Sequence, residues 1–180
     1  MNVRDHLKEM GVDAIKNYCV ENTIPAAVAM FHTQGDFNLS NVLRTANFFG
    51  FREVFYIEGS KSWDRRGAVG TQHYTPMNYC RTLAEFWDAI EDKYIPIALE
   101  NNINYKMESL FEFNWPSNPI IIVGEEQAGL SDEVLQGCNA VVTIPAFGSV
   151  RSMNVGTAAG IAMGIYRNHY ERKRLTSSIS

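Results

Sequence analysis

The chain has few of the residues that build metal sites or disulfide frameworks. Its 180 residues include three cysteines and four histidines. The cysteines, Cys19, Cys80 and Cys138, are odd in number and far apart, and no CxxC pair is present. Such spacing is typical of free thiols rather than of structural zinc or paired disulfides. Because the histidines are equally scattered, the sequence predicts no metal site.

Long apolar runs are missing as well. The apolar run at 120–123 is short, whereas a helix needs about 20 apolar residues to span a bilayer. The first residues are charged and lack the apolar stretch of a signal peptide, so we expect a cytoplasmic location. The composition, 46% hydrophobic and 20% charged, is that of a globular protein. We expect a single domain over 1–180, with a helical extension at 1–25 and a basic tail at 167–180.

An excess of positive charge is also absent. The formal net charge is −4, which disfavours a nucleic-acid partner because phosphate binding depends mainly on Lys and Arg. The charge is unevenly distributed along the chain, however. Residues 85–133 contain eleven acidic and two basic side chains, whereas residues 134–180 contain five basic and one acidic. The sequence therefore predicts a bipolar molecule with one face able to meet a polyanion.

Short apolar runs alternate with helical patterns along the chain. Buried strands are expected at 27–31, 53–57, 95–99, 120–123 and 140–144. Helices are expected from an N-cap at Asn38 to Gly50, and at 83–90, 131–135 and 152–169. Three glycines in the last helix predict close packing against another backbone, within the chain or across a dimer. The alternation predicts an α/β fold, with a mainly parallel sheet and helices on both faces.

Three loops that follow predicted strands have an unusual composition. They lie at 100–102, 124–130 and 145–154, at strand ends where α/β sheets usually bind ligands. Such loops can present backbone groups to a planar, polar ligand. Taken singly, Gly124, Gly129 and Gly148 could instead only terminate strands and cap helices. No GxGxxG or GxxxxGK[ST] pattern is present, which excludes a dinucleotide fingerprint and a P-loop.

Three motifs in a fixed order cover about residues 27–166. The block at 38–51 reads as N-x5-R-T-A followed by G-F. The block at 124–131 fits G-x-E-x-x-G-L-S, and the block at 144–155 is similar to I-P-M-x-G-x-x-x-S-L-N-V. Together they resemble the SPOUT superfamily of methyltransferases, and specifically its TrmH-type branch that acts on the ribose of tRNA and rRNA.

The resemblance implies a SPOUT-type fold with a deep trefoil knot in the C-terminal segment, and a homodimer. It also implies RNA methylation, the transfer of a methyl group from S-adenosylmethionine to a ribose 2'-OH of tRNA or rRNA. The cofactor pocket would use Leu99, Glu100, Gly124, Glu126, Ile144, Met153 and Asn154. The residues that match family positions near the reacting groups are Asn38, Arg44, Glu126, Ser152 and Asn154.

Four of the five residues near the reacting groups also have a plainer interpretation; Asn154 is less easily dismissed, because asparagine is a poor helix former and a good hydrogen-bond partner. Arg44 lies away from the apolar stripe of its helix and could be a solvated surface arginine. Within the family comparison it is either the general base or a clamp on the neighbouring phosphate. Because a guanidinium is effectively always charged, the clamp is physically easier. Asn38 and Ser152 could be helix caps, and Glu126 could be an exposed turn residue.

Basic residues near aromatic ones are the candidates for RNA contact, since phosphate binding and base stacking often occur together. They are Lys61, Arg65, Arg66 and His73, with Trp63 and Tyr74 interleaved, and Arg167, Arg172, Lys173 and Arg174 in the tail. An ordinary solvated surface is an equally good interpretation of each one singly. Two other functions stay open: a non-catalytic RNA-binding or assembly protein with the same fold, and a methyltransferase acting on a base or a protein.

Overall fold

The computed structural model describes the chain except residues 1–2, 33–35, 60–62, 102–103, 126–127 and 178–180. The strands are β1 (Ile24–Phe31), β2 (Phe51–Ile57), β3 (Met77–Cys80), β4 (Ile95–Leu99), β5 (Glu108–Ser109), β6 (Pro119–Val123) and β7 (Ala140–Thr143). The α-helices are α1 (Val12–Glu21), α2 (Asp36–Phe49), α3 (Leu83–Ile90), α4 (Asp132–Gly137) and α5 (Val155–Ser177). Short 3-10 turns lie at Asp5–Leu7, Arg66–Ala68 and Thr71–His73.

The seven strands form one parallel sheet in the order β3-β2-β1-β6-β4-β7-β5. All five residues of β6 are buried, and this strand pairs with β1 on one side and β4 on the other. A strand covered on both faces carries a continuous apolar run, as β6 does. The predicted α/β class with a parallel sheet is therefore confirmed.

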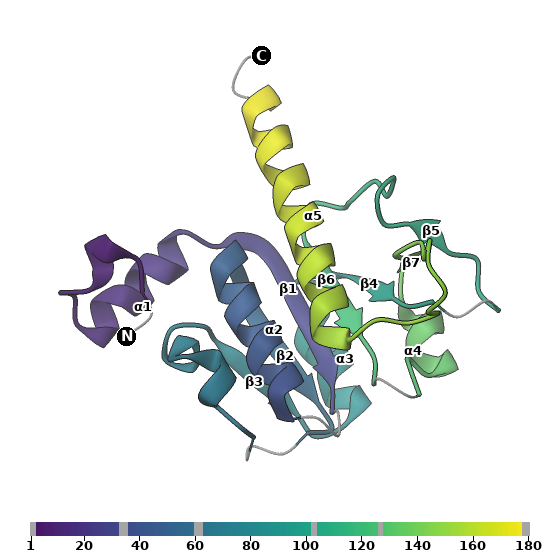
Figure 1. Cartoon of the computed structure of the whole chain (residues 1–180), viewed down its shortest axis with the longest axis horizontal. Helices are drawn as coiled ribbons and strands as arrows, with labels where there is room; N and C mark the ends of the chain where they lie inside the picture. Colours follow the sequence, from purple (N-terminus) through teal and green to yellow (C-terminus); the bar gives the residue numbers. More distant parts are fainter. Residues whose placement is uncertain (1–2, 33–35, 60–62, 102–103, 126–127, 178–180) are drawn as a thin grey trace.

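Helices cover both faces of the sheet, as predicted (Figure 1). Val28 and Met30 of β1 belong to the core under α2 and α5, whereas Ala27 and Ala29 belong to the core under α3 and α4. This division follows from the alternation of side chains along a strand. Apart from the sheet, Ile15 of α1 forms a small separate core with its neighbours Leu7 and Tyr74.

Two helix starts differ from the sequence prediction. Helix α2 begins at Asp36, so Asn38 lies in its first turn and is not the N-cap. Helix α5 runs over Val155–Ser177 instead of 152–169, because Asn154 caps it by accepting the backbone N–H of Thr157 over 3.1 Å. Ser152 therefore lies in the preceding loop and is not the cap. The predicted end of α2 at Gly50 is confirmed, and this glycine has φ +71°.

Helices α2 and α5 pack side by side, and the glycines of α5 line the contact. A Cβ on Gly156 would lie 3.5 Å from Cβ of Asn41, and one on Gly164 would lie 3.2 Å from Cζ of Phe49. The close packing predicted for this helix is thus found within the chain. No helix in the described part of the chain is long and apolar enough to cross a membrane.

Candidate active site

Three adjacent strands bring the three unusual loops to one edge of the sheet. Strand β4 lies between β6 and β7, and all run in parallel, so the carboxyl ends at Leu99, Val123 and Thr143 lie together. The segments that follow them line a single cleft of about 640 Å³. This volume is in the range of small-ligand sites, roughly 300–1,000 Å³. A cleft therefore lies at the carboxyl edge of the sheet, where the sequence predicts the site.

The loop at 124–130 folds back on itself and forms one side of the cleft. Glu125 and Gly129 exchange two backbone hydrogen bonds, of 3.3 and 3.1 Å. A Cβ on Gly124 would overlap the backbone of Gly129, and Gly129 itself has φ +66°. Both positions therefore require glycine. These glycines do more than terminate a strand, because they allow a tight turn whose backbone borders the cleft.

The carboxylate of Glu100 joins the first loop to the second. It accepts the backbone N–H of Asn101 over 2.8 Å and that of Leu130 over 2.7 Å. A side chain on Gly129 would collide with this carboxylate, with 2.5 Å between its Cβ and Oε2. Glu100 was predicted as a pocket residue, and the structure places it in the lining of the cleft, where its charge holds two backbone segments together.

The loop at 145–154 forms the outer wall of the cleft and carries exposed apolar side chains. Phe147 is 92% exposed and Val150 is 71% exposed. The side-chain amide of Asn101 donates to the backbone oxygen of Arg151 over 2.5 Å, which ties this wall to the first loop. The sequence pattern indicated the loops but did not single out Phe147, Val150 or Asn101 as cleft residues. The apolar composition of the loop was the available signal.

Asn38 and Asn154 form a direct link between α2 and the start of α5. The Nδ2 of Asn154 donates to the Oδ1 of Asn38 over 2.9 Å. Asn38 is only 7% exposed, so its amide is held among packed groups. The structure thus brings two predicted site residues together across 116 positions of sequence.

The other predicted site residues are distributed as follows. Leu99, Gly124, Ile144, Ser152 and Met153 all line the cleft. Glu126 lies outside the described residues.

Three candidates, Asn38, Asn154 and Arg44, are not among the residues that line the cleft. Arg44 lies apart from the two bonded asparagines. It is exposed on α2, as its position on the helical wheel predicts, and it does not line the cleft of its own chain. Among the described residues its guanidinium has no hydrogen-bond or ion-pair partner. Phe37 and Phe48 are 54% and 80% exposed. Phe37 precedes Arg44 by about two helical turns and Phe48 follows it by about one, so all three side chains lie on the same outward side of α2.

The predicted RNA-contact residues form two groups, and Lys61 lies outside the described residues. In the first group the guanidinium of Arg66 makes an ion pair with Asp64, at 2.5 Å. This hydrogen-bonded pair lowers the pKa of the Asp64 carboxyl below its usual value. Arg65 lies 5.8 Å from the ring centre of Trp63. Arg66 is thus already engaged, whereas Arg65 is a cation beside an aromatic ring.

The second group lies on α5. Arg167 and Arg174 both pair with Glu171, at 2.6 and 3.1 Å. Arg172 and Lys173 instead have no ion-pair partner among the described residues, and both line a second groove. The described part of the predicted basic tail is therefore the last part of α5, and two of its four cations have no acidic partner among the described residues.

Comparison with known proteins identifies relatives of this chain. Residues 25–164 match the model of the SpoU rRNA Methylase family. The chain is 30% identical over 131 residues to the 23S rRNA (guanosine-2'-O-)-methyltransferase RlmB of Coxiella burnetii, covering 70% of this chain and 51% of that protein. It is 23% identical over 153 residues to the tRNA (guanosine(18)-2'-O)-methyltransferase of Aquifex aeolicus, covering 81% of this chain and 70% of that one.

A solved structure has the same fold. The A. aeolicus TrmH/SpoU tRNA modifying enzyme matches with a TM-score of 0.79 and 18% identity, covering 92% of this chain and 85% of that one. The chain spans about half the length of the RlmB relatives it matches. Because the family model covers most of the chain, from the first strand to the middle of α5, the chain belongs to the SpoU rRNA methylase family.

Proposed function

We propose that this chain transfers a methyl group from S-adenosylmethionine to a ribose 2'-OH of tRNA or rRNA. The observation that carries the proposal is the convergence of three motif-bearing loops on one cleft at the carboxyl edge of a parallel sheet. The named relatives of RlmB and tRNA (guanosine(18)-2'-O)-methyltransferase type support the choice of reaction.

The cleft fits a cofactor with a flat ring and several polar groups. Gly124 and Gly129 bring the backbone of their loop to the edge of the cleft, at a place where any Cβ would intrude. Leu99, Ile144 and Met153 supply apolar lining beside these polar groups. S-adenosylmethionine would bring an activated, cationic methyl donor to this cleft, and the transfer needs no metal.

Within the chain, the remaining task is to hold and orient the ribose hydroxyl. Asn154 and Ser152 lie at the junction of the cleft wall and α5, where a hydroxyl could be hydrogen-bonded. We assign Arg44 to a phosphate next to the target ribose, since a guanidinium clamps phosphate in a bidentate way and stays charged. Positioning of this kind, in line with the methyl donor, supplies much of the catalysis in such transfers.

We further propose that two copies of the chain associate through the outward faces of α2 and α5. Phe37 and Phe48 leave large apolar surfaces on both sides of Arg44, and α5 packs directly beside α2. Association would cover these side chains and bring Arg44 to the cleft of the partner. Sedimentation of the wild type and of Phe48→Glu tests this, since the variant is expected to be monomeric.

Two finer features follow from the same family resemblance. A deep trefoil knot formed by the C-terminal segment would leave a tightened core when both ends are pulled. The stretched length in a single-molecule experiment would then be shorter than that of a fully extended chain.

A cytoplasmic location is the other expectation, and fractionation of cells tests it.

Binding of the cofactor and loss of activity in two variants test the proposal. Calorimetric titration is expected to detect S-adenosylmethionine, and labelled cofactor is expected to transfer its methyl group to RNA. Arg44→Ala and Asn154→Ala should stay folded and lose this transfer. Full activity in both variants would contradict the site assignment, and a complete lack of cofactor binding would favour a non-catalytic RNA-binding protein.

A further inference from the structure

A second groove lies on the far side of α5 from α2, away from the cofactor cleft. Its volume is about 400 Å³. One wall is the segment between β5 and β6, which Figure 1 shows running alongside α5. The other wall is the C-terminal half of α5 itself. We call this site the α5 groove; its lining is Leu110, Phe111, Phe113, Trp115, Ile165, Asn168, His169, Arg172, Lys173 and Thr176.

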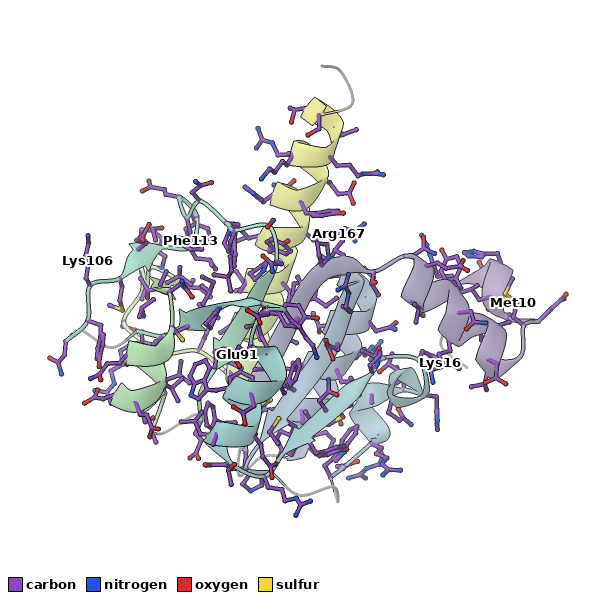
Figure 2. The ribbon with its side chains drawn as sticks, turned by 180° about the vertical axis from the view of Figure 1, so that it is seen from behind. Met10, Lys16, Glu91, Lys106, Phe113 and Arg167 are labelled. Carbon is purple, nitrogen blue, oxygen red and sulfur yellow. The ribbon has the colours of Figure 1, made fainter. Side chains whose placement is uncertain are left out.

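Aromatic side chains form one wall of the α5 groove. Trp115 is buried and packs edge-on against Phe113 and Tyr166, with ring centres 5.1 and 5.3 Å apart. Phe111 is 56% exposed at the outer end of this wall. Figure 2 shows Phe113 and Arg167 on opposite flanks of α5. The wall is therefore anchored from behind by Trp115, and Phe111 offers its ring to a ligand.

Positive charge lines the opposite wall, and no carboxylate is among the described lining residues. Arg172 and Lys173 are exposed and have no ion-pair partner in the described part of the chain, whereas Arg167 and Arg174 on the same helix are both paired with Glu171. The two cations that face the aromatic wall, Arg172 and Lys173, are thus the two without an acidic partner among the described residues.

A ligand that complements this groove needs a flat apolar ring next to a negative charge. We infer that the α5 groove binds a nucleotide of single-stranded RNA, with its base against Phe111 and Phe113 and its phosphate beside Arg172 and Lys173. Stacking on aromatic rings next to a cationic path is how proteins hold unpaired nucleotides without reading their sequence. The inference rests on RNA as the partner in the proposed function, and adds a docking site remote from the reacting groups.

Binding of a fluorescein-labelled oligouridylate to the full chain, measured by anisotropy at several KCl concentrations, tests the inference. Its weakly stacked bases are free to enter the groove. Phe111→Ala should weaken binding roughly tenfold with little change in salt dependence, and Phe111→Trp should restore it. Arg172→Ala should weaken binding and reduce the slope of log K against log salt by roughly 0.7. Arg174→Ala, which removes the same charge from a paired residue, is the matched control and should change binding little.

Several results would overturn the inference. They are no oligouridylate binding by the wild type, an unchanged affinity in Phe111→Ala, or an equal loss in Arg172→Ala and Arg174→Ala. Dissociation of a dimer in Phe111→Ala, seen by sedimentation, would instead assign the groove to a second copy. Cofactor titration of the same variants keeps the two proposals apart. If the wild type methylates RNA but the groove variants bind oligouridylate normally, only the inference about the groove is wrong. If the groove variants lose oligouridylate binding but the protein binds no S-adenosylmethionine, only the proposed reaction is wrong.

Discussion

The side chain of Asn154 donates to that of Asn38 over 2.9 Å, while its own oxygen accepts the backbone N–H of Thr157. One residue thus caps α5 and ties that helix to α2. The cleft wall at 145–154 ends at this residue, so the link sets where the wall meets the helix. A structural and a catalytic role for Asn154 are therefore compatible, and variants can separate them.

Asn154→Ser should separate the cap from the link. Serine is a good N-cap, so α5 should keep its start, but its side chain is too short to reach Asn38. We expect Asn154→Ser to be about 1 kcal/mol more stable than Asn154→Ala in urea unfolding. Both variants should lose methyl transfer. An Asn154→Ser protein with wild-type activity would show that the link to Asn38 is dispensable.

Glu100→Gln should loosen the cofactor cleft. The carboxylate accepts two backbone N–H groups from different loops, and an amide has only one oxygen to offer. Hydrogen bonds to a charged group contribute about 1.5–3 kcal/mol each, so one lost bond should give a measurable loss of unfolding free energy. Weaker binding of S-adenosylmethionine should accompany it. Glu112→Gln, the same charge change on an exposed residue outside the cleft, is the control, and an equal effect there would count against this account.

Gly160→Ala should stabilise the protein more than the same substitution at Gly164, one turn further along α5. A Cβ at Gly160 would lie 3.6 Å from Cγ2 of Thr45, an ordinary contact, whereas one at Gly164 would lie 3.2 Å from Phe49. Alanine is favoured over glycine inside a helix by about 0.5–1 kcal/mol. Chemical unfolding should therefore show a gain for Gly160→Ala and a smaller gain or a loss for Gly164→Ala. A loss at Gly160 would contradict the account that a methyl group fits between this position and Thr45.

Much of this fold follows from patterns within short windows of sequence. The apolar run of β6 and the 3.6-residue stripe of α2 predicted a buried strand and an outward-facing Arg44, and both are found. Strand β3 was missed because it is an edge strand whose first three residues are only half-buried, with Asn78 among them. Strand β5 has two residues, too few to give a periodic signal.

The site was predictable only in part, for a different reason. Glycines and polar residues after three strands indicated the cleft, since parallel strands end at the same edge. The bond between Asn38 and Asn154, and that between Glu100 and Leu130, join segments far apart in the chain. No local pattern encodes such pairs. The same holds for Arg172 and Arg174, whose different charge environments depend on how Glu171 is oriented.

Stability should fall in mild acid through His169. Burial, and then the positive charges of Lys173 and Arg172, lower the pKa of this imidazole from its ordinary value. Between the lowered and the ordinary pKa the unfolded chain binds more protons than the folded one, so stability rises with pH and is complete above about pH 6.5. NMR titration should show His169 protonating at a lower pH than a histidine in an unfolded peptide. In Arg172→Ala this pKa should rise, and an unchanged value would contradict the charge effect.

The most direct test of the proposed reaction is the chemical identity of its product. The purified protein would be incubated with methyl-labelled S-adenosylmethionine and total RNA, the RNA digested to nucleosides, and the labelled nucleoside identified by mass spectrometry. We predict a 2'-O-methylated nucleoside that is absent with Arg44→Ala. Label on a base, label on protein, or no label from a protein that binds the cofactor would contradict the proposal.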